Sequence, residues 1–111
     1  MITAVVGSRN FQDYSFLKEI LEGYTITGIV SGGAQGADQL AKRYAEEKEL
    51  PIEVFKPDYA RFGKANPYAR NEALVDASDQ VVAFWDGKSR GTSHALKYAQ
   101  KKGKKVFIIP F

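Results

Sequence analysis

The amino-acid sequence predicts an α/β fold with three layers, in which a five-stranded parallel sheet is covered by helices on both faces. Short apolar runs alternate with stretches of helical periodicity along all 111 residues. The apolar runs are nearly continuous, as is typical of strands buried on both faces. Because crossovers between parallel strands are right-handed, we expect the strand order 3-2-1-4-5, with a topological switch between strands 1 and 4.

The first half of the chain predicts two strand–helix units. Residues 2–6 are mostly apolar and β-branched and end at Gly7, which predicts a buried central strand. Apolar residues then repeat at helical spacing between residues 16 and 21, with Asp13 or Ser15 as the N-cap and Gly23 as the stop. Residues 26–31 predict strand 2, and residues 37–45 carry the clearest helical stripe of the chain.

The second half predicts three strands and two helices. Residues 52–55 form a short strand after Pro51, whereas residues 56–66 show no clean period and predict a long functional loop. The aromatic residues Tyr59 and Phe62 in this loop either pin it to the body or stack on a base. Asn66 followed by Pro67 predicts a helix over about 67–77. The last elements are a strand at 80–85, a helix at 93–102 and a strand at 106–109.

Composition limits the kinds of protein that this chain can be. With 44% hydrophobic and 26% charged residues, residues 1–111 are expected to form a single globular domain. The sequence holds no cysteine and one histidine, which excludes disulfides, thiolate zinc sites and multi-histidine metal sites. No apolar stretch approaches the roughly 18 residues of a membrane span. We therefore expect a cytoplasmic protein with no metal and no membrane partner.

Three polar or glycine-bearing segments, at residues 7–9, 31–38 and 85–92, each follow a strand of the predicted sheet. In a parallel sheet such loops meet at the carboxyl edge of the strands. Glycine lets backbone N–H groups approach a ligand closely, and the start of a helix favours negative charge. We therefore expect one site for a ligand that carries phosphate or a similar anion. The candidate ligand-binding residues are Gly7, Ser8, Arg9, Gly32, Gly33, Ala34, Gly36, Asp38, Arg70, Asn71, Trp85, Asp86, Ser89, Gly91 and Thr92.

Several of these residues also have a structural interpretation. The planar donor forks of Arg9 and Arg70 suit phosphate, but Arg70 with Asn71 equally suits a tie between a helix and the long loop. Asp38 either favours the start of its helix or accepts hydrogen bonds from a ribose hydroxyl. Gly91 and Thr92 either contact an anion or form an ordinary helix cap.

Asp38 and Asp86 are the candidate catalytic carboxylates, because each lies beside a predicted anion-binding loop. His94 would need a carboxylate partner to act as a general acid or base. Asp86 is the carboxylate near it in the sequence.

Positive charge gathers near the end of the chain, at Lys97, Lys101, Lys102, Lys104 and Lys105, although the formal net charge is only +3. These lysines complement the negative C-terminal end of the last helix, or they form a patch for the phosphates of nucleic acid. We expect them at the edge of the sheet opposite the glycine-bearing loops, which disfavours nucleic acid as the ligand of those loops.

The motifs form an ordered series that resembles the YspA-like branch of the SLOG superfamily and spans nearly the whole chain. The series is Gly7-Ser8-Arg9, Ser31-Gly32-Gly33-Ala34 with Gly36-Ala37-Asp38, Arg70-Asn71, Ala83-Phe84-Trp85-Asp86-Gly87, and Ser89 with Gly91-Thr92. This superfamily has a Rossmann-like fold and includes the LOG phosphoribohydrolases and the DNA-processing DprA proteins. Many of its members are regarded as sensors or processors of nucleotides and NAD-derived ligands, often in bacterial or phage conflict systems.

The resemblance implies the binding of a nucleotide-type ligand, such as an ADP-ribose-like molecule, with no required cofactor. It does not extend to LOG catalysis, since only Gly91-Thr92 matches the pattern Pro-Gly-Gly-x-Gly-Thr-x-x-Glu and Ala95 stands in place of the glutamate. Enzyme activity therefore stays open. The alternatives are a nucleotide-processing hydrolase that cleaves an N-glycosidic bond, and a single-stranded DNA-binding protein. The small size of the domain also suggests a homo-oligomer.

Overall fold

The computed structural model describes residues 1–33, 35–55 and 68–111. Its sheet has five parallel strands in the order β3-β2-β1-β4-β5, which confirms the predicted topology. The strands are β1 (Ile2–Gly7), β2 (Gly28–Ser31), β3 (Ile52–Val54), β4 (Gln80–Trp85) and β5 (Lys105–Pro110). The helices of the described residues are α1 (Tyr14–Glu22), α2 (Ala37–Glu47), α4 (Ala69–Asp76) and α5 (Arg90–Lys101).

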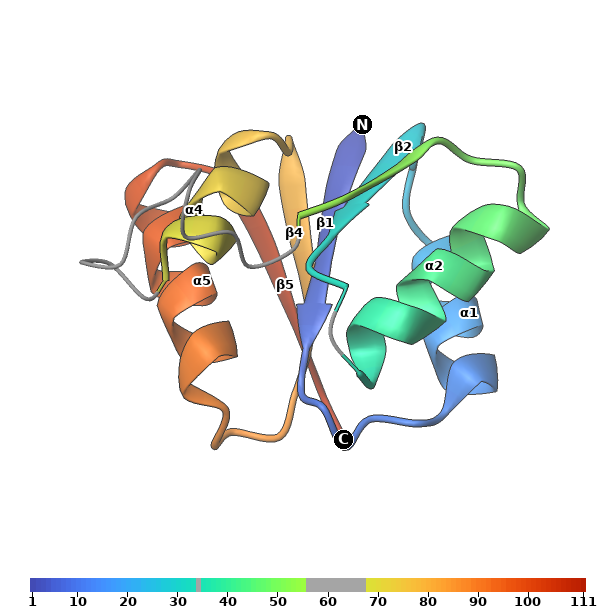
Figure 1. Cartoon of the computed structure of the whole chain (residues 1–111), viewed down its shortest axis with the longest axis horizontal. Coiled ribbons are helices and arrows are strands. Elements are labelled where there is room, and N and C mark those ends of the chain that lie inside the picture. The colour runs from blue at the N-terminus through green and yellow to red at the C-terminus, as the bar shows by residue number, and fades with distance from the viewer. Residues whose placement is uncertain (34, 56–67) are drawn as a thin grey trace.

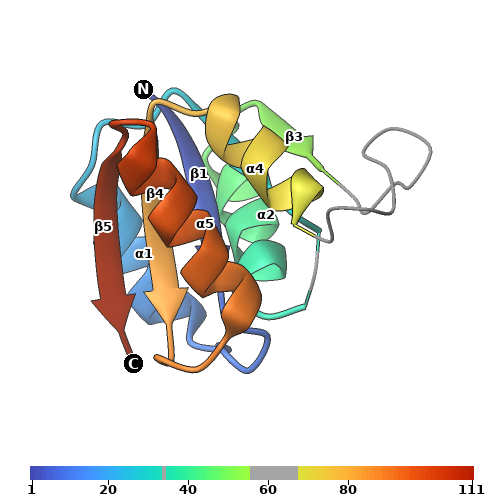
Figure 2. The same cartoon turned by 90° about the vertical axis from the view of Figure 1, so that its left-hand side faces the viewer.

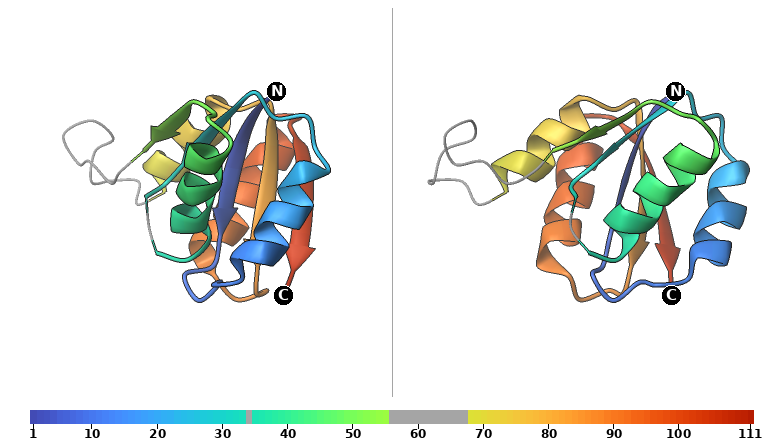
Figure 3. Two further views of the ribbon diagram at one scale, coloured as in Figure 1. Left: turned by 90° about the vertical axis from the view of Figure 1, so that its right-hand side faces the viewer. Right: turned by 45° about the vertical axis from the view of Figure 1, so that its right-hand side comes forward.

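The helices form two layers on opposite faces of the sheet (Figure 1). Helices α4 and α5 cover one face, as Figure 2 shows, and α1 and α2 cover the other, as Figure 3 shows. This arrangement follows from the switch in strand order at β1 and β4, which pair with Gly7 opposite Phe84. The loops that leave β1, β2 and β4 consequently lie at one edge of the sheet.

Each face of the sheet has its own apolar core. Alternate residues of β1 point to opposite faces, so that Val6 packs under α4 and α5 while Val5 packs under α1 and α2. Val81 and Val82 of β4 divide in the same way. Both central strands are buried on both faces, as their continuous apolar sequences predict.

The N-cap of α1 is Asp13, one of the two predicted caps. Its Oδ1 accepts a hydrogen bond from the backbone N–H of Phe16 at 3.1 Å. Gly23 ends the helix as predicted, although with a right-handed φ of −78°. Its N–H donates to the carbonyl of Ile20 at 3.1 Å and so closes a tight last turn.

The structure corrects several predicted boundaries. Strand β2 begins at Gly28 and not at residue 26, and β3 ends at Val54. The larger correction is at α5, which begins at Arg90, three residues before the predicted start. Ser89 is its N-cap residue, and the N–H of Ser93 already donates to the carbonyl of Ser89 at 3.1 Å. Gly91 and Thr92 therefore lie within the first turn of the helix.

Helix α4 ends at Asp76, close to the prediction, and is preceded by Tyr68. The predicted loop at 56–66 with Tyr59 and Phe62, and the predicted helix start at Asn66 and Pro67, lie outside the described residues. None of the helices in the described part of the chain is long and apolar enough to cross a membrane.

Candidate functional site

A pocket of about 280 Å³ opens at the switch point of the sheet. It lies at the carboxyl ends of β1 and β2 and is bounded by the first turns of α2, α4 and α5. Ligands of open α/β sheets bind at this position. The pocket is lined by Val6, Gly7, Arg9, Gly32, Asp38, Arg70, Asn71, Leu74, Ser89, Gly91, Thr92 and Ala95.

Among the described residues, three charged side chains line this pocket, namely Arg9, Asp38 and Arg70. Burial lowers the pKa of Arg70 from the ordinary arginine value, while the nearby carboxylate of Asp38 opposes this shift and the charge of Arg9 adds to it. An arginine remains protonated in proteins in spite of such shifts. The described part of the lining therefore holds two positive groups and one negative group, a balance that favours an anionic ligand.

Arg70 also ties the ends of two strands to α4. Its Nη1 donates to the carbonyl of Gly32 at 2.7 Å, after β2, and to that of Phe55 at 3.4 Å, after β3. The tie requires glycine at position 32, because a Cβ there would lie 2.8 Å from Cζ of Arg70 and 2.9 Å from Oδ2 of Asp38. The guanidinium thus has a structural role and lines the pocket as well.

The first turn of α5 brings further polar groups to the pocket. Ser89, Gly91 and Thr92 all line it, and Thr92 is only 5% exposed. The hydroxyl of Ser89 donates to Oγ1 of Thr92 at 3.2 Å. The first N–H groups of a helix have no partner within the helix, and they carry a partial positive charge. This turn can therefore complement an anion.

Of the described lining residues, Val6, Leu74 and Ala95 are apolar. Sequence reasoning missed Val6 and Leu74 as pocket residues, because an apolar residue that lines a pocket has the same pattern as one in the core. Ala95 has a detectable signal, since it lies one helical turn after Gly91 and so shares its face.

Five described candidates do not line the pocket, namely Ser8, Gly33, Gly36, Trp85 and Asp86. Ser8 is fully buried; its Oγ accepts a hydrogen bond from the N–H of Asp86 at 3.1 Å. Gly36 has a φ of 78°, and a Cβ there would lie 2.5 Å from the carbonyl oxygens of Ser8 and Arg9. Ser8 thus links the loop after β1 to the loop after β4, and Gly36 allows the loop after β2 to pack closely against the loop after β1. Ala34 lies outside the described residues.

Asp86 stabilises the turn that leads into α5. Its Oδ1 accepts hydrogen bonds from the backbone N–H groups of Lys88 at 2.8 Å and Ser89 at 3.0 Å. These bonds are the main reason why the pKa of Asp86 is lowered. Trp85 supports the same turn, since its Nε1 donates to the carbonyl of Ser89 at 3.1 Å.

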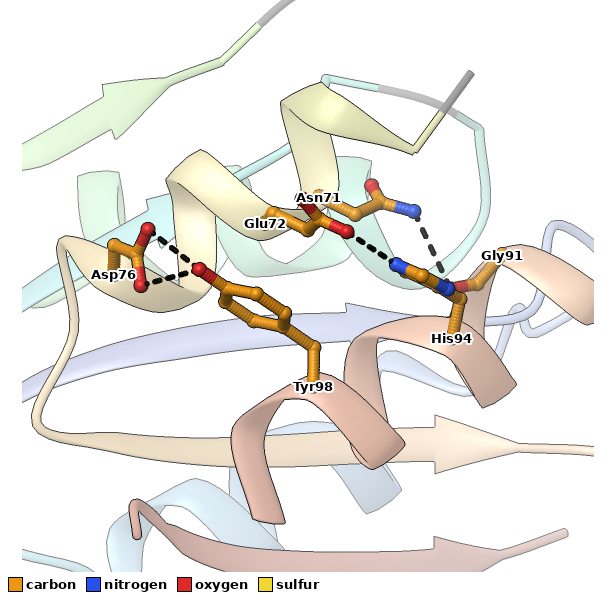
Figure 4. Close-up of polar contacts among 6 residues, drawn as sticks. All are labelled: Asn71, Glu72, Asp76, Gly91, His94 and Tyr98. Atoms are coloured by element: carbon orange, nitrogen blue, oxygen red, sulfur yellow. Dashed lines mark hydrogen bonds and ion pairs between the residues drawn. The ribbon is translucent and has the colours of Figure 1, made fainter. Parts of the chain in front are cut away.

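His94 has a carboxylate partner that is distant in the sequence. Its Nε2 lies 2.7 Å from Oε2 of Glu72, as Figure 4 shows, and Asp86 is not its hydrogen-bonding partner. Both residues lie beside the pocket and not in its lining. Sequence reasoning could not find this pair, because Glu72 and His94 are on different helices. Among the described residues, no group of three or more acidic or histidine side chains is placed to hold a metal ion.

A model of the YspA, cpYpsA-related SLOG family matches residues 1–62 of the chain. The chain belongs to this SLOG family. The match covers β1, β2 and β3 and therefore includes the pocket residues Gly7, Arg9, Gly32 and Asp38. SLOG membership indicates a nucleotide-related function, in agreement with the position of the pocket.

Two curated proteins are similar to this SLOG chain. The Gene 61 protein of Mycobacterium phage D29 is 38% identical over 81 residues, which cover 68% of this chain and 65% of that protein. The uncharacterized SPbeta prophage-derived protein YoqJ of Bacillus subtilis (strain 168) is 42% identical over 40 residues, or 36% of this chain and 23% of that protein. The chain thus matches less than two thirds of the length of each relative.

The SLOG pocket of this chain has a methyl group where the LOG pattern has its glutamate. Ala95 lines the pocket and is 1% exposed. Asp38, which is 8% exposed, is the carboxylate among the described residues of the pocket lining. It is therefore the candidate for any chemistry that requires a carboxylate from this part of the lining.

Proposed function

We propose that the pocket binds a nucleotide or an NAD-derived, ADP-ribose-like molecule. The observation that carries this proposal is the presence of Arg9, Arg70 and the first turn of α5 around one pocket at the switch point. These groups come from three separate segments of the chain and share a preference for negative charge. SLOG membership supports the same class of ligand.

The charges of the pocket suggest how such a ligand lies in it. A phosphate group is attracted by Arg9 and by the first turn of α5, and it is repelled by the carboxylate of Asp38. Asp38 is an acceptor of hydrogen bonds, which suits the hydroxyl groups of a ribose. The apolar side chains of Val6, Leu74 and Ala95 also line the pocket and can contact the sugar or the base.

The size of the pocket favours a ligand of about one nucleotide. Its volume of about 280 Å³ lies just below the range of about 300–1,000 Å³ that is common for small-molecule sites. The pocket itself is therefore closer in size to one nucleotide than to two. A dinucleotide such as NAD would place one of its halves outside this volume.

Thermal unfolding with a panel of AMP, ADP-ribose, NAD and cyclic nucleotides tests the proposal. We expect at least one of them to raise the midpoint, since a ligand at a hundredfold excess over its Kd stabilises a protein by about 2.7 kcal/mol. Thr92→Val removes a pocket hydroxyl with little change in shape and should reduce the shift. Ser93→Ala is the matched control, because Ser93 lies on the same turn outside the lining. No shift with any ligand of the panel would contradict the proposal.

The second candidate function is hydrolysis of an N-glycosidic bond in such a ligand. It is favoured by one observation, the buried carboxylate of Asp38 in the pocket lining. In this function Asp38 stabilises positive charge on the ribose or activates water. Incubation with AMP or NAD, followed by chromatography of free adenine and nicotinamide, tests it with Asp38→Asn as the comparison. No release of base above the buffer control excludes the activity for these substrates.

A further inference from the structure

The helices α4 and α5 are joined by three side-chain contacts along their shared seam (Figure 4). Nδ2 of Asn71 donates to the carbonyl of Gly91 at 3.3 Å, and Nε2 of His94 lies 2.7 Å from Oε2 of Glu72. The hydroxyl of Tyr98 contacts both carboxylate oxygens of Asp76 at 2.9 Å. The seam is thus fixed by polar bonds in addition to the apolar core beneath it.

The contact between Glu72 and His94 lies on the same helical turns as the pocket lining. Glu72 is adjacent to Asn71 and follows Arg70 by two residues, and both of these line the pocket. His94 is adjacent to Ala95 and follows Thr92 by two residues, and these also line it. The distance between the two turns therefore determines the distance between the pocket groups of α4 and those of α5.

The imidazole of His94 is held from two directions. Glu72 accepts a hydrogen bond from Nε2, since an ionised carboxylate can only accept. The ring of Tyr68 stacks on the imidazole, with centroids 4.4 Å apart and planes 16° from parallel. The side chains of His94 and Glu72 are 33% and 25% exposed, so that water competes only in part for their contact. An imidazole held in this way can keep α4 and α5 at a fixed separation.

We propose that Glu72 and His94 are positioning residues for ligand binding. They hold the first turns of α4 and α5 at the separation that lets Arg70 and Thr92 contact one ligand at the same time. The proposal rests on the proposed binding of a nucleotide-type ligand. It assigns no contact with the ligand to Glu72 or His94, in accordance with their position outside the lining.

Calorimetric titration with AMP and with ADP-ribose tests this role in four variants. Glu72→Ala removes the acceptor, and His94→Phe removes the donor but keeps a ring for Tyr68. Each should raise Kd by about tenfold, within the range of coupling between contacting residues. The double variant should lose no more than either single variant, because the two side chains act as one contact. Glu72→Gln keeps an acceptor and should lose about threefold or less.

Tyr98→Phe is the matched control for general loosening of the seam. It removes the contact with Asp76, which lies one turn further from the pocket, and we expect Kd within about twofold of the original chain. Wild-type affinity in Glu72→Ala, a loss in Glu72→Gln as large as in Glu72→Ala, or an equal loss in Tyr98→Phe would each overturn the proposal. Urea unfolding of every variant separates changes in affinity from changes in global stability.

Hydrogen exchange distinguishes failure of this proposal from failure of the proposed function. In the absence of ligand, backbone amides at residues 72–75 and 94–97 should exchange faster in Glu72→Ala and His94→Phe than in Tyr98→Phe. If the original chain binds neither nucleotide, the proposed function fails for these probes and the exchange data alone decide whether the contact holds the two turns. Unchanged exchange in both variants would overturn the positioning role.

Discussion

Arg70 combines two roles that are usually separate. Its guanidinium holds the carbonyl of Gly32 at 2.7 Å, and it also provides positive charge to the pocket lining. The planar fork of arginine allows this, because several N–H donors point in different directions at once. The two interpretations that the sequence left open for this residue, a structural tie and a ligand contact, are therefore compatible.

Replacement of Arg70 by methionine should reduce both stability and binding. Arg70→Met keeps much of the side-chain volume but leaves the partly buried carbonyl of Gly32 without its donor, which should lower the free energy of unfolding by about 1–3 kcal/mol. Nucleotide-induced stabilisation should also fall, since a positive group is lost from the pocket. Urea unfolding with and without AMP measures both effects. Lys42→Met removes an exposed positive charge from α2 and is the control. Equal stability and equal ligand response of Arg70→Met and the control would contradict this account.

At the scale of elements, the turn between β4 and α5 explains why this helix begins earlier than its sequence suggests. Thr92 and Ser93 look like cap residues. The helix begins earlier, directly after the turn in which the carboxylate of Asp86 accepts hydrogen bonds from the N–H groups of Lys88 and Ser89. The ends of β1 and β4 were predictable, because their apolar runs are continuous and end in polar residues or glycine. The end of a helix depends on side-chain bonds that propensity alone does not reveal.

The candidate site, like the helix ends, could be predicted only in part from the sequence. Arg9, Gly32 and Thr92 could be predicted to come together, because parallel strands bring their loops to one edge. Leu74 could not be predicted as a pocket residue, since its apolar character indicates only burial. The contact between Glu72 and His94 depends on the packing of α4 against α5, for which the sequence carries no local signal.

The turn at Asp86 should make stability depend on pH in the acid range. Backbone hydrogen bonds lower the pKa of Asp86 in the folded state, so its charge contributes stability above the unfolded pKa of about 4. That contribution is lost as pH falls through the folded pKa. Asp86→Asn should therefore be less stable than the original chain at pH 7, and the difference should shrink as the pH falls below about 4.

Urea unfolding from pH 7 downward measures this difference. Glu19→Gln, which removes an exposed carboxylate from α1, controls for the change in net charge. A difference between Asp86→Asn and the original chain that stays constant into the acid range would show that the carboxylate charge does not stabilise the turn.

At the scale of the whole molecule, the two ends of α5 have different chemistry. Its first turn lines the pocket, while its last turn, the following loop and the start of β5 carry Lys101, Lys102, Lys104 and Lys105 at the opposite edge of the sheet (Figure 2). Lys104 is engaged with the body, since its Nζ donates to the carbonyl of Ser78 at 2.7 Å. The lysine-rich end and the pocket therefore lie at different ends of α5.

The most direct test of the account is a titration of the ¹⁵N-labelled protein with AMP and ADP-ribose, followed by two-dimensional NMR. Binding at the proposed pocket predicts that the largest shifts of backbone amide signals occur at Gly32, Asn71 and Thr92, which lie on three separate segments around it. The signals of residues 101–105 should change little. Absence of shifts with both ligands, or shifts confined to residues 101–105, would contradict nucleotide binding at the switch point of the sheet.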